Sequence, residues 1–264
     1  MRLLKYLMLS ASLLLVACSD EKGSSSQAAK AEKKVFDCTI TYGWESRKPY
    51  QFYENKKMQG IDVEILAKAA NSANCQLDFV EKSWSELLED VEAGKVDVLA
   101  GATPTQERKV YANFSKPYRE ESFVLFIPTN SRFSGDSLDQ FLSFGNKIGI
   151  SSGYYYGDAV DQLMNHVQYS RLFVGSATNE ASFYNVEYGR AGGVLVDPVE
   201  GRYIMKRKGM TSKMKESDVT VPADSVAYMF SKKSAKADKI EIIMNTLESM
   251  VANNQVEKFI ASYQ

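Results

Sequence analysis

Histidine and cysteine are scarce in this chain, and their scarcity limits its chemistry. The 264 residues include one histidine, His166, and three cysteines. A structural zinc site takes four such ligands, so a multi-histidine or four-cysteine metal site is excluded. His166 lies in an expected helix with no nucleophile motif beside it, so a serine triad has no support either. We expect neither a metal nor a cofactor.

An excess of positive charge is also absent. Lys and Arg number 32 against 33 Asp and Glu, which gives a formal net charge of −1. A nucleic-acid surface needs a basic patch, so we expect no nucleic-acid partner. Hydrophobic content of 44% and charged content of 25% are ordinary for a globular protein. The length therefore fits one large or two modest domains.

The apolar run at the N-terminus is too short to cross a bilayer. Leu7–Val16 spans roughly ten residues, whereas a transmembrane helix needs about 20. Arg2 and Lys5 precede it, as basic residues precede the apolar part of a secretory signal. The sequence therefore predicts a signal peptide over residues 1–17.

The signal ends in Leu15-Val16-Ala17-Cys18, which resembles the bacterial lipobox, whose cysteine is lipidated and becomes the first residue. An ordinary signal that happens to end near a cysteine is the alternative. The segment Ser19–Lys34 that follows contains no aromatic side chain and cannot bury a core. We expect residues 18–34 to be a lipidated Cys18 and a flexible tether that holds an extracytoplasmic protein on a membrane, in the periplasm or at the cell surface.

Strands and helices alternate from residue 35 onward. Strands are expected over 35–41, 76–80 and 96–100, with helices between them that begin at Ile61 and Ser83. Ser83 and Glu86 have the spacing of a capping box, and Gly94 ends that helix. This order of strands and helices implies a parallel sheet with right-handed crossovers.

A second α/β set follows. We expect its strands over 122–127, 147–150, 172–174 and 194–196, and its helices over 158–166 and 179–189. A strand over 226–230 and helices over 238–252 and 255–262 complete the chain.

Several short motifs occur together in a characteristic order. They are Pro49-Tyr50-Gln51-Phe52, Gly60-Ile61-Asp62-Val63-Glu64, Trp84 with Leu87-Leu88, Gly94-Lys95-Val96-Asp97, Gly101-Ala102-Thr103-Pro104-Thr105-Gln106-Glu107-Arg108, Phe114-Ser115-Lys116-Pro117-Tyr118, Gly189-Arg190-Ala191, Val196-Asp197 and Val226-Ala227-Tyr228-Met229-Phe230. In these motifs the chain resembles the type 3 extracellular solute-binding proteins, the polar amino-acid binders of ABC importers. The resemblance covers roughly residues 35–263.

The resemblance implies an α/β, two-lobe periplasmic-binding-protein fold of type II, in which each lobe is a central sheet flanked by helices. Residues 35–127 and 223–264 would form lobe 1, and residues 128–222 lobe 2. Two crossovers, near 126–130 and 221–226, would form the hinge. It further implies a monomer that binds an amino-acid-like solute between its lobes and delivers it to an ABC permease, without enzyme activity.

By the same resemblance, Arg108 holds the α-carboxylate of the solute. Arginine suits this role because its planar fork matches a carboxylate. Thr103 would add a hydroxyl, and backbone N–H groups near Gly101 would complete the site. The alternative for Arg108 is a solvated charge at the start of a helix.

Asp197 would hold the α-ammonium from the opposite lobe. Its alternative role is to cap the helix that begins at Pro198, and the two roles are compatible. Trp84 and Tyr50 would form aromatic walls over the ligand, which exclude water and strengthen the ion pairs. Core packing is the alternative for Trp84, and a place merely near the cleft is the alternative for Tyr50.

Two positions depart from the family pattern. Arg47 stands where an aromatic residue is common, and it could read an anionic side chain or point to solvent. In the turn Ser151-Ser152-Gly153-Tyr154-Tyr155-Tyr156-Gly157, Tyr154 and Tyr155 stand where threonines are usual. Tyr154 could therefore shape a pocket for a different or larger solute.

Besides Cys18, the chain has two cysteines, Cys38 and Cys75. Cys38 lies in the first expected strand and Cys75 just before the second, and such strand starts can be neighbours in a βαβ unit. An extracytoplasmic compartment is oxidising, so we expect a disulfide between them, with two buried thiols as the alternative.

Two other functions stay open. Some proteins of this fold are cyclohexadienyl dehydratases, and such an enzyme would need a carboxylic acid beside a leaving hydroxyl, for which Asp197 and Glu200 are the candidates. A free-standing ligand sensor is the third possibility. Sensor proteins of this fold normally continue into membrane and signalling domains, so we favour transport.

Overall fold

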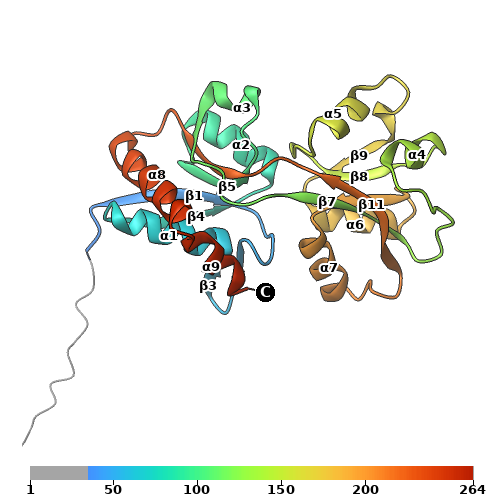
Figure 1. Cartoon of the computed structure of the whole chain (residues 1–264), viewed down its shortest axis with the longest axis horizontal. Helices are drawn as coiled ribbons and strands as arrows, with labels where there is room; N and C mark the ends of the chain where they lie inside the picture. The colour runs from blue at the N-terminus through green and yellow to red at the C-terminus, as the bar shows by residue number, and fades with distance from the viewer. Residues whose placement is uncertain (1–34, 264) are drawn as a thin grey trace, which may run out of the picture. The chain divides into compact units, whose positions relative to one another are not determined.

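A computed structural model describes residues 35–263. The expectations for the signal peptide, Cys18 and the tether lie outside the described residues. The described chain contains two five-stranded sheets and one two-stranded sheet (Figure 1). The expected α/β fold with two sheets flanked by helices is confirmed. We call each five-stranded sheet with its helices a lobe.

The first lobe has the strand order β4-β1-β5-β12-β6. Its three parallel strands are β1 (Cys38–Trp44), β4 (Cys75–Glu81) and β5 (Val98–Ala102). Two further strands extend it: β12 (Ala227–Ser231) pairs antiparallel with β5, and β6 (Ala112–Phe114) pairs antiparallel with β12. The helices of this lobe are α1 (Ile61–Ser72), α2 (Trp84–Ala93), α3 (Gln106–Tyr111), α8 (Ala237–Ala252) and α9 (Gln255–Ala261). A hairpin of β2 (Phe52–Glu54) and β3 (Lys57–Gln59) precedes α1.

Local sequence signals explain the boundaries of α2. The expected capping box is present. The Ser83 side chain accepts from the backbone N–H of Glu86, the third helical residue, and the Glu86 side chain accepts from the backbone N–H of Ser83. Gly94 ends the helix at φ 78°, a left-handed conformation that favours glycine. The apolar face of α2 packs on one side of the sheet, while α1 and α8 lie beside each other on the opposite side (Figure 1).

The second lobe has the strand order β11-β7-β10-β8-β9. Its strands are β7 (Ser122–Pro128), β8 (Ile148–Ser151), β9 (Phe173–Ser176), β10 (Gly193–Val196) and β11 (Met214–Pro222). Its helices are α4 (Leu138–Ser143), α5 (Asp158–Asn165), η1 (Ser170–Leu172), α6 (Asn179–Glu187) and α7 (Pro198–Arg207). Two apolar clusters, one on each face of this sheet, form its core.

The first connection between the lobes lies earlier in the chain than the sequence suggests. Strand β7 pairs with β10 and β11 and so belongs to the second sheet, which corrects both the boundary at residue 127 and the crossover near 126–130. The chain passes between the lobes over residues 118–121 and returns over 223–226. These segments are hydrogen-bonded to each other, Tyr118 N to Val226 O at 3.0 Å and Val226 N to Arg119 O at 2.9 Å. Because β7 is apolar along its whole length, its sequence alone does not tell which sheet it joins.

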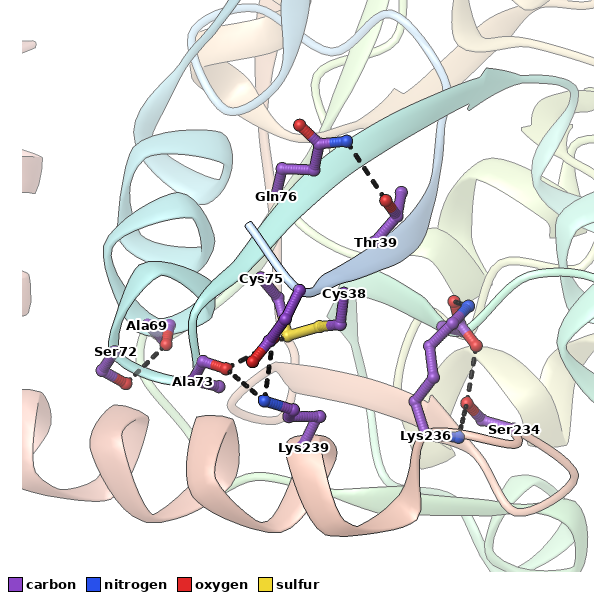
Figure 2. Close-up of a disulfide and its surroundings, with 12 residues drawn as sticks. Cys38, Thr39, Ala69, Ser72, Ala73, Cys75, Gln76, Ser234, Lys236 and Lys239 are labelled. Atoms are coloured by element: carbon purple, nitrogen blue, oxygen red, sulfur yellow. Dashed lines mark hydrogen bonds and ion pairs between the residues drawn. A yellow bond between two sulfur atoms is a disulfide. The ribbon is translucent and has the colours of Figure 1, made fainter. Parts of the chain in front are cut away.

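The expected disulfide between Cys38 and Cys75 is confirmed (Figure 2). Cys38 and Cys75 are register partners at the start of the parallel strands β1 and β4, with their Cα atoms 4.6 Å apart. This spacing lies in the range that a disulfide requires. Lys239 of α8 donates a hydrogen bond to the carbonyl of Ala73 beside the disulfide (Figure 2). The disulfide therefore joins β1 and β4 near the start of α8.

Candidate functional site

The predicted site residues come from loops that follow strands of the two sheets. Arg47 follows β1, and Gly101 and Thr103 lie at the end of β5. From the second lobe, Tyr154 follows β8 and Asp197 follows β10. In α/β folds ligands bind outside the carboxyl ends of the strands. The five residues therefore lie where such a fold places a binding site.

Arg108 is buried at the start of the short helix α3. Thr105 caps this helix, and its side chain accepts a hydrogen bond from the backbone N–H of Arg108. The guanidinium donates to the carbonyl of Thr103 at 3.0 Å and, across the lobes, to the carbonyl of Gly153 at 2.9 Å. It also lies over the ring of Trp84, with 5.7 Å between the Cζ atom and the centroid. The alternative of a solvated Arg108 is wrong.

No carboxylate among residues 35–263 forms an ion pair or hydrogen bond with Arg108. Burial lowers the pKa of its guanidinium, because desolvation disfavours the charged form. Two carbonyls satisfy only part of the five N–H donors of an arginine. Arg108 is thus a buried cation that forms no direct pair with a carboxylate of the described chain, because Glu107 and Glu121 act on it only from a longer distance, and it could accept a carboxylate.

Arg47 lies between carboxylates from two parts of the chain, with 4% of its side chain exposed. Its NH2 group donates to Glu121 at 3.0 Å, and its Nε donates to Glu200 of the second lobe at 3.1 Å. The guanidinium also lies 5.2 Å from the ring of Tyr154 and 5.7 Å from that of Tyr50. The alternative that Arg47 points to solvent is therefore wrong.

Burial and opposite charges act against each other at these groups. Burial alone would lower the pKa of Arg47, but the surrounding groups raise it, Tyr154 most, then Glu200, Glu121 and Glu45. Burial raises the pKa of Glu200 and raises that of Glu45 to about 7, while Arg47 opposes both shifts. Arg47 therefore stays charged, and the carboxyl groups of Glu45 and Glu200 bind protons more readily than in water.

Tyr154 and Trp84 bring the two lobes into contact. The Tyr154 hydroxyl donates to Glu45 of the first lobe, and its ring meets Trp84 edge-on at 5.8 Å between centroids. Trp84 Nε1 donates to the carbonyl of Gly153 at 3.2 Å. Trp84 also belongs to the apolar core on the α2 side of the first sheet. It serves as core residue and as a wall beside Arg108.

Asp197 has the capping role that its position before Pro198 suggests. Its Oδ1 atom accepts from the backbone N–H groups of Val199 and Glu200, both at 2.9 Å. Its Oδ2 atom accepts from the hydroxyl of Tyr50 in the first lobe at 3.1 Å. Tyr50 is thus a contact between the lobes rather than only a residue near the cleft.

A second buried arginine, Arg119, lies in the first connection between the lobes. Its guanidinium stacks on the ring of Tyr50 at 4.1 Å and forms ion pairs of 3.6 Å with Asp62 and Glu121. A Cβ atom at Gly101, where φ is +68°, would lie only 2.9 Å from Arg119 NH2. Glycine at this position therefore allows the close approach of the guanidinium.

Little space remains where these groups meet. Gly101, Thr103 and Arg108 line a cavity of ≈ 10 Å³ together with Trp84 and Tyr154, and Arg47, Glu121 and Tyr155 complete its lining. This volume is about what one water molecule needs. A larger cavity of ≈ 270 Å³ lies beside Glu45 and Glu200. The chain's own side chains, Arg47 among them, thus fill most of the space beside Arg108, whereas the larger cavity stays open between the lobes.

Sequence reasoning missed Glu45, Glu121 and Arg119 and considered Glu200 only as an acid. Glu121 and Glu200 lie 74 and 153 positions from Arg47, so no local pattern separates them from surface charges. The one available signal was the pair Glu45 and Arg47 within a single loop. Of the predicted residues, the structure brings together Arg47, Trp84, Gly101, Thr103, Arg108 and Tyr154 around the small cavity.

Two lobes joined by two paired connections, with buried charges between them, define a two-lobe α/β binding protein. The sequence profile of "Bacterial extracellular solute-binding proteins, family 3" matches residues 40–264. The chain belongs to this family. No helix within residues 35–263 has the length and apolar character to cross a membrane.

Individual relatives are distant. A "Probable histidine-binding protein" of Neisseria gonorrhoeae is 26% identical over 157 residues, which cover 58% of this chain and 56% of the relative. The chain thus spans about half the length of that relative. The "Probable amino-acid-binding protein YxeM" of Bacillus subtilis (strain 168) is 21% identical over 271 residues, which cover 100% of this chain and 96% of the relative.

Solved structures show the same fold. "An ancestral arginine-binding protein bound to arginine" superimposes with a TM-score of 0.72 and 22% identity, covering 85% of this chain and 97% of the other. At this identity the likeness concerns the fold alone.

Proposed function

We propose that the protein captures a small amino-acid-like solute between its two lobes and delivers it to an ABC importer. It acts by binding and release, without chemical conversion of the solute. The observation that carries this proposal is Arg108, a buried guanidinium that has two carbonyl partners and no carboxylate partner among the described residues. A solute carboxylate supplies the missing counter-ion.

The remaining groups fit this role. Thr103 and the backbone near Gly101 lie beside Arg108 and line the same cavity. Trp84 covers one side of the guanidinium, and its ring keeps water away from the ion pair. Asp197 offers a carboxylate from the second lobe to an ammonium group, although its oxygens also cap α7 and accept from Tyr50.

Solute entry requires the lobes to separate. The cavity beside Arg108 is only ≈ 10 Å³, and the contacts Arg108–Gly153, Arg47–Glu200 and Tyr154–Glu45 close it. Movement at the paired connections 118–121 and 223–226 would open the site, as hinge closure does in periplasmic binding proteins. The proposal includes attachment to the membrane by a lipid on Cys18, an extracytoplasmic location and a monomeric state.

The names of the relatives support this class of solute. They include histidine-, arginine- and amino-acid-binding proteins. The family description, extracellular solute-binding proteins, supports the location. The dehydratase alternative gains no support from these names, which describe binding proteins throughout.

Thermal unfolding of the protein with single amino acids tests the proposal. Each amino acid is paired with its amide or its decarboxylated amine, which keep the side chain but lack the carboxylate. A solute present at 100 times its Kd stabilises the folded protein by about 2.7 kcal/mol, which raises the midpoint by roughly 5–10 °C for a domain of this size. We expect such a rise with at least one amino acid and none with its amide. Equal effects of acid and amide, or no effect of any amino acid, would contradict the proposal.

A further inference from the structure

Arg47 is placed as a bound guanidinium ligand would be placed. It belongs to the loop after β1, and its guanidinium lies between Glu121, beside the hinge, and Glu200, on the second lobe. The Cζ atom of Arg47 lies 5.7 Å from the ring centroid of Tyr50 and 5.2 Å from that of Tyr154. Carboxylates that pair with the N–H groups and aromatic rings near the planar cation are the features that recognise a guanidinium.

We propose that Arg47 is a specificity-determining residue, the built-in occupant of a guanidinium-binding box, and that it excludes solutes with charged side chains. The box consists of Glu121, Glu200, Tyr50 and Tyr154. This inference rests on the proposed function, because it names the class of solute that the same site admits. That class has a carboxylate for Arg108 and an uncharged side chain.

Charge balance within the site supports the exclusion of cations. A cationic side chain that entered beside Arg47 would bring a further positive charge to carboxylates that already pair with Arg47, and Glu121 also pairs with Arg119. Glu200 is further engaged by Asn179, which donates to its second oxygen at 2.9 Å. Two like charges in a buried site repel each other strongly, and juxtaposed like charges are a common means of rejecting wrong partners.

Anionic side chains are excluded for the complementary reason. Arg47 donates from Nε and NH2 to its own two carboxylates. In the proposed function Arg108 pairs with the α-carboxylate of the solute. A side-chain carboxylate near Arg47 would therefore lie close to Glu121 and Glu200 without a free cation of its own. A buried charge that lacks a partner is costly. This argues against the idea that Arg47 reads an anionic side chain.

Removal of Arg47 should empty the box and let a free guanidinium enter. The probe is methylguanidinium chloride at low millimolar concentration, compared with sodium chloride at equal ionic strength. We expect methylguanidinium to raise the unfolding midpoint of Arg47→Ala by more than ~2 °C relative to sodium chloride. Wild type should show no such difference.

Arg202→Ala is the matched control, because Arg202 forms a similar two-bond pair with Glu216 on the surface, at 2.6 and 2.8 Å. This variant should not respond to methylguanidinium. If Arg47→Ala does not fold, Arg47→Gln serves in its place, since it keeps one donor and most of the side-chain volume. If methylguanidinium raises the unfolding midpoint of neither Arg47 variant more than that of wild type, the proposal is overturned.

A second measurement concerns arginine itself. Arg47→Ala should bind arginine at least ~10-fold more tightly than wild type does, as a buried guanidinium gains two carboxylates. When Arg108→Ala is added to Arg47→Ala, the tighter binding of arginine should be lost. Methylguanidinium should still raise the unfolding midpoint of this double variant. Because methylguanidinium has no carboxylate, its effect does not depend on Arg108. A lost methylguanidinium response therefore overturns the role of Arg47, whereas an arginine gain that is insensitive to Arg108 overturns the proposed function.

Discussion

Glu45 should make the stability of this protein fall as the pH rises toward neutrality. Burial raises the pKa of its carboxyl from 4.5 to about 7, although Arg47 and the hydroxyl of Tyr154 act in the opposite direction. A group with a raised pKa in the folded chain binds its proton more tightly there than in the unfolded chain. Its contribution to stability is complete below pH 4.5 and is lost as the pH passes through 7.

The size of this loss follows from the two pKa values. The difference between about 7 in the folded chain and 4.5 in the unfolded chain corresponds to about 3 kcal/mol, since each tenfold change in proton affinity is worth about 1.4 kcal/mol. Neighbouring charged groups titrate with Glu45, so this figure is an upper estimate. Glu45→Gln keeps the shape of the protonated group and removes its titration.

Urea unfolding at pH 5, 6, 7 and 8 measures the effect. The free energy of unfolding of Glu45→Gln, relative to wild type, should rise by about 2–3 kcal/mol across this range. Glu89→Gln, at an exposed position of α2, should keep a constant difference from wild type. A difference between Glu45→Gln and wild type that stays constant within about 0.5 kcal/mol from pH 5 to 8 would refute the reasoning.

Three further outcomes are expected. Asp197→Ala should lower the free energy of unfolding without ligand by about 1–2 kcal/mol in urea, because it removes the cap of α7; an unchanged value would show that the cap contributes nothing. Cys18→Ala should release the protein from membranes on cell fractionation, and a variant that stays fully bound would end the idea of a lipid anchor. Mass spectrometry of the unreduced protein should find Cys38 linked to Cys75, which closes a loop worth about 3–4 kcal/mol, and free thiols there would contradict the structure.

Much of the fold could be predicted because its elements carry local signals. Helix α2 has a capping box at Ser83 and a terminal glycine at Gly94, and α8 has a long amphipathic stripe that packs on α1. The short strands β2, β3 and β6 have three residues each and no periodicity that a sequence could reveal. Strand β11 was missed because its sequence is mostly polar and its place at the edge of the sheet leaves much of it outside the core.

The site could be predicted only where a motif marks it. Arg108 follows the turn after β5 within a continuous motif, so its burial beside Thr103 and Gly101 accords with the sequence. The partners of Arg47 could not be found in this way. Glu121 and Glu200 reach it only through the folding of two lobes, and in the sequence they resemble any surface glutamate.

Calorimetric titration of Arg108→Ala tests the central claim most directly, with whichever amino acid stabilises wild type. If the α-carboxylate pairs with Arg108, its removal leaves a buried anion without a partner, which costs roughly 2–5 kcal/mol, or ~30- to several-thousand-fold in Kd. Glu107→Ala, an exposed neighbour, should bind as wild type does. An Arg108→Ala protein that binds the same solute within a factor of about three of wild type would contradict the account.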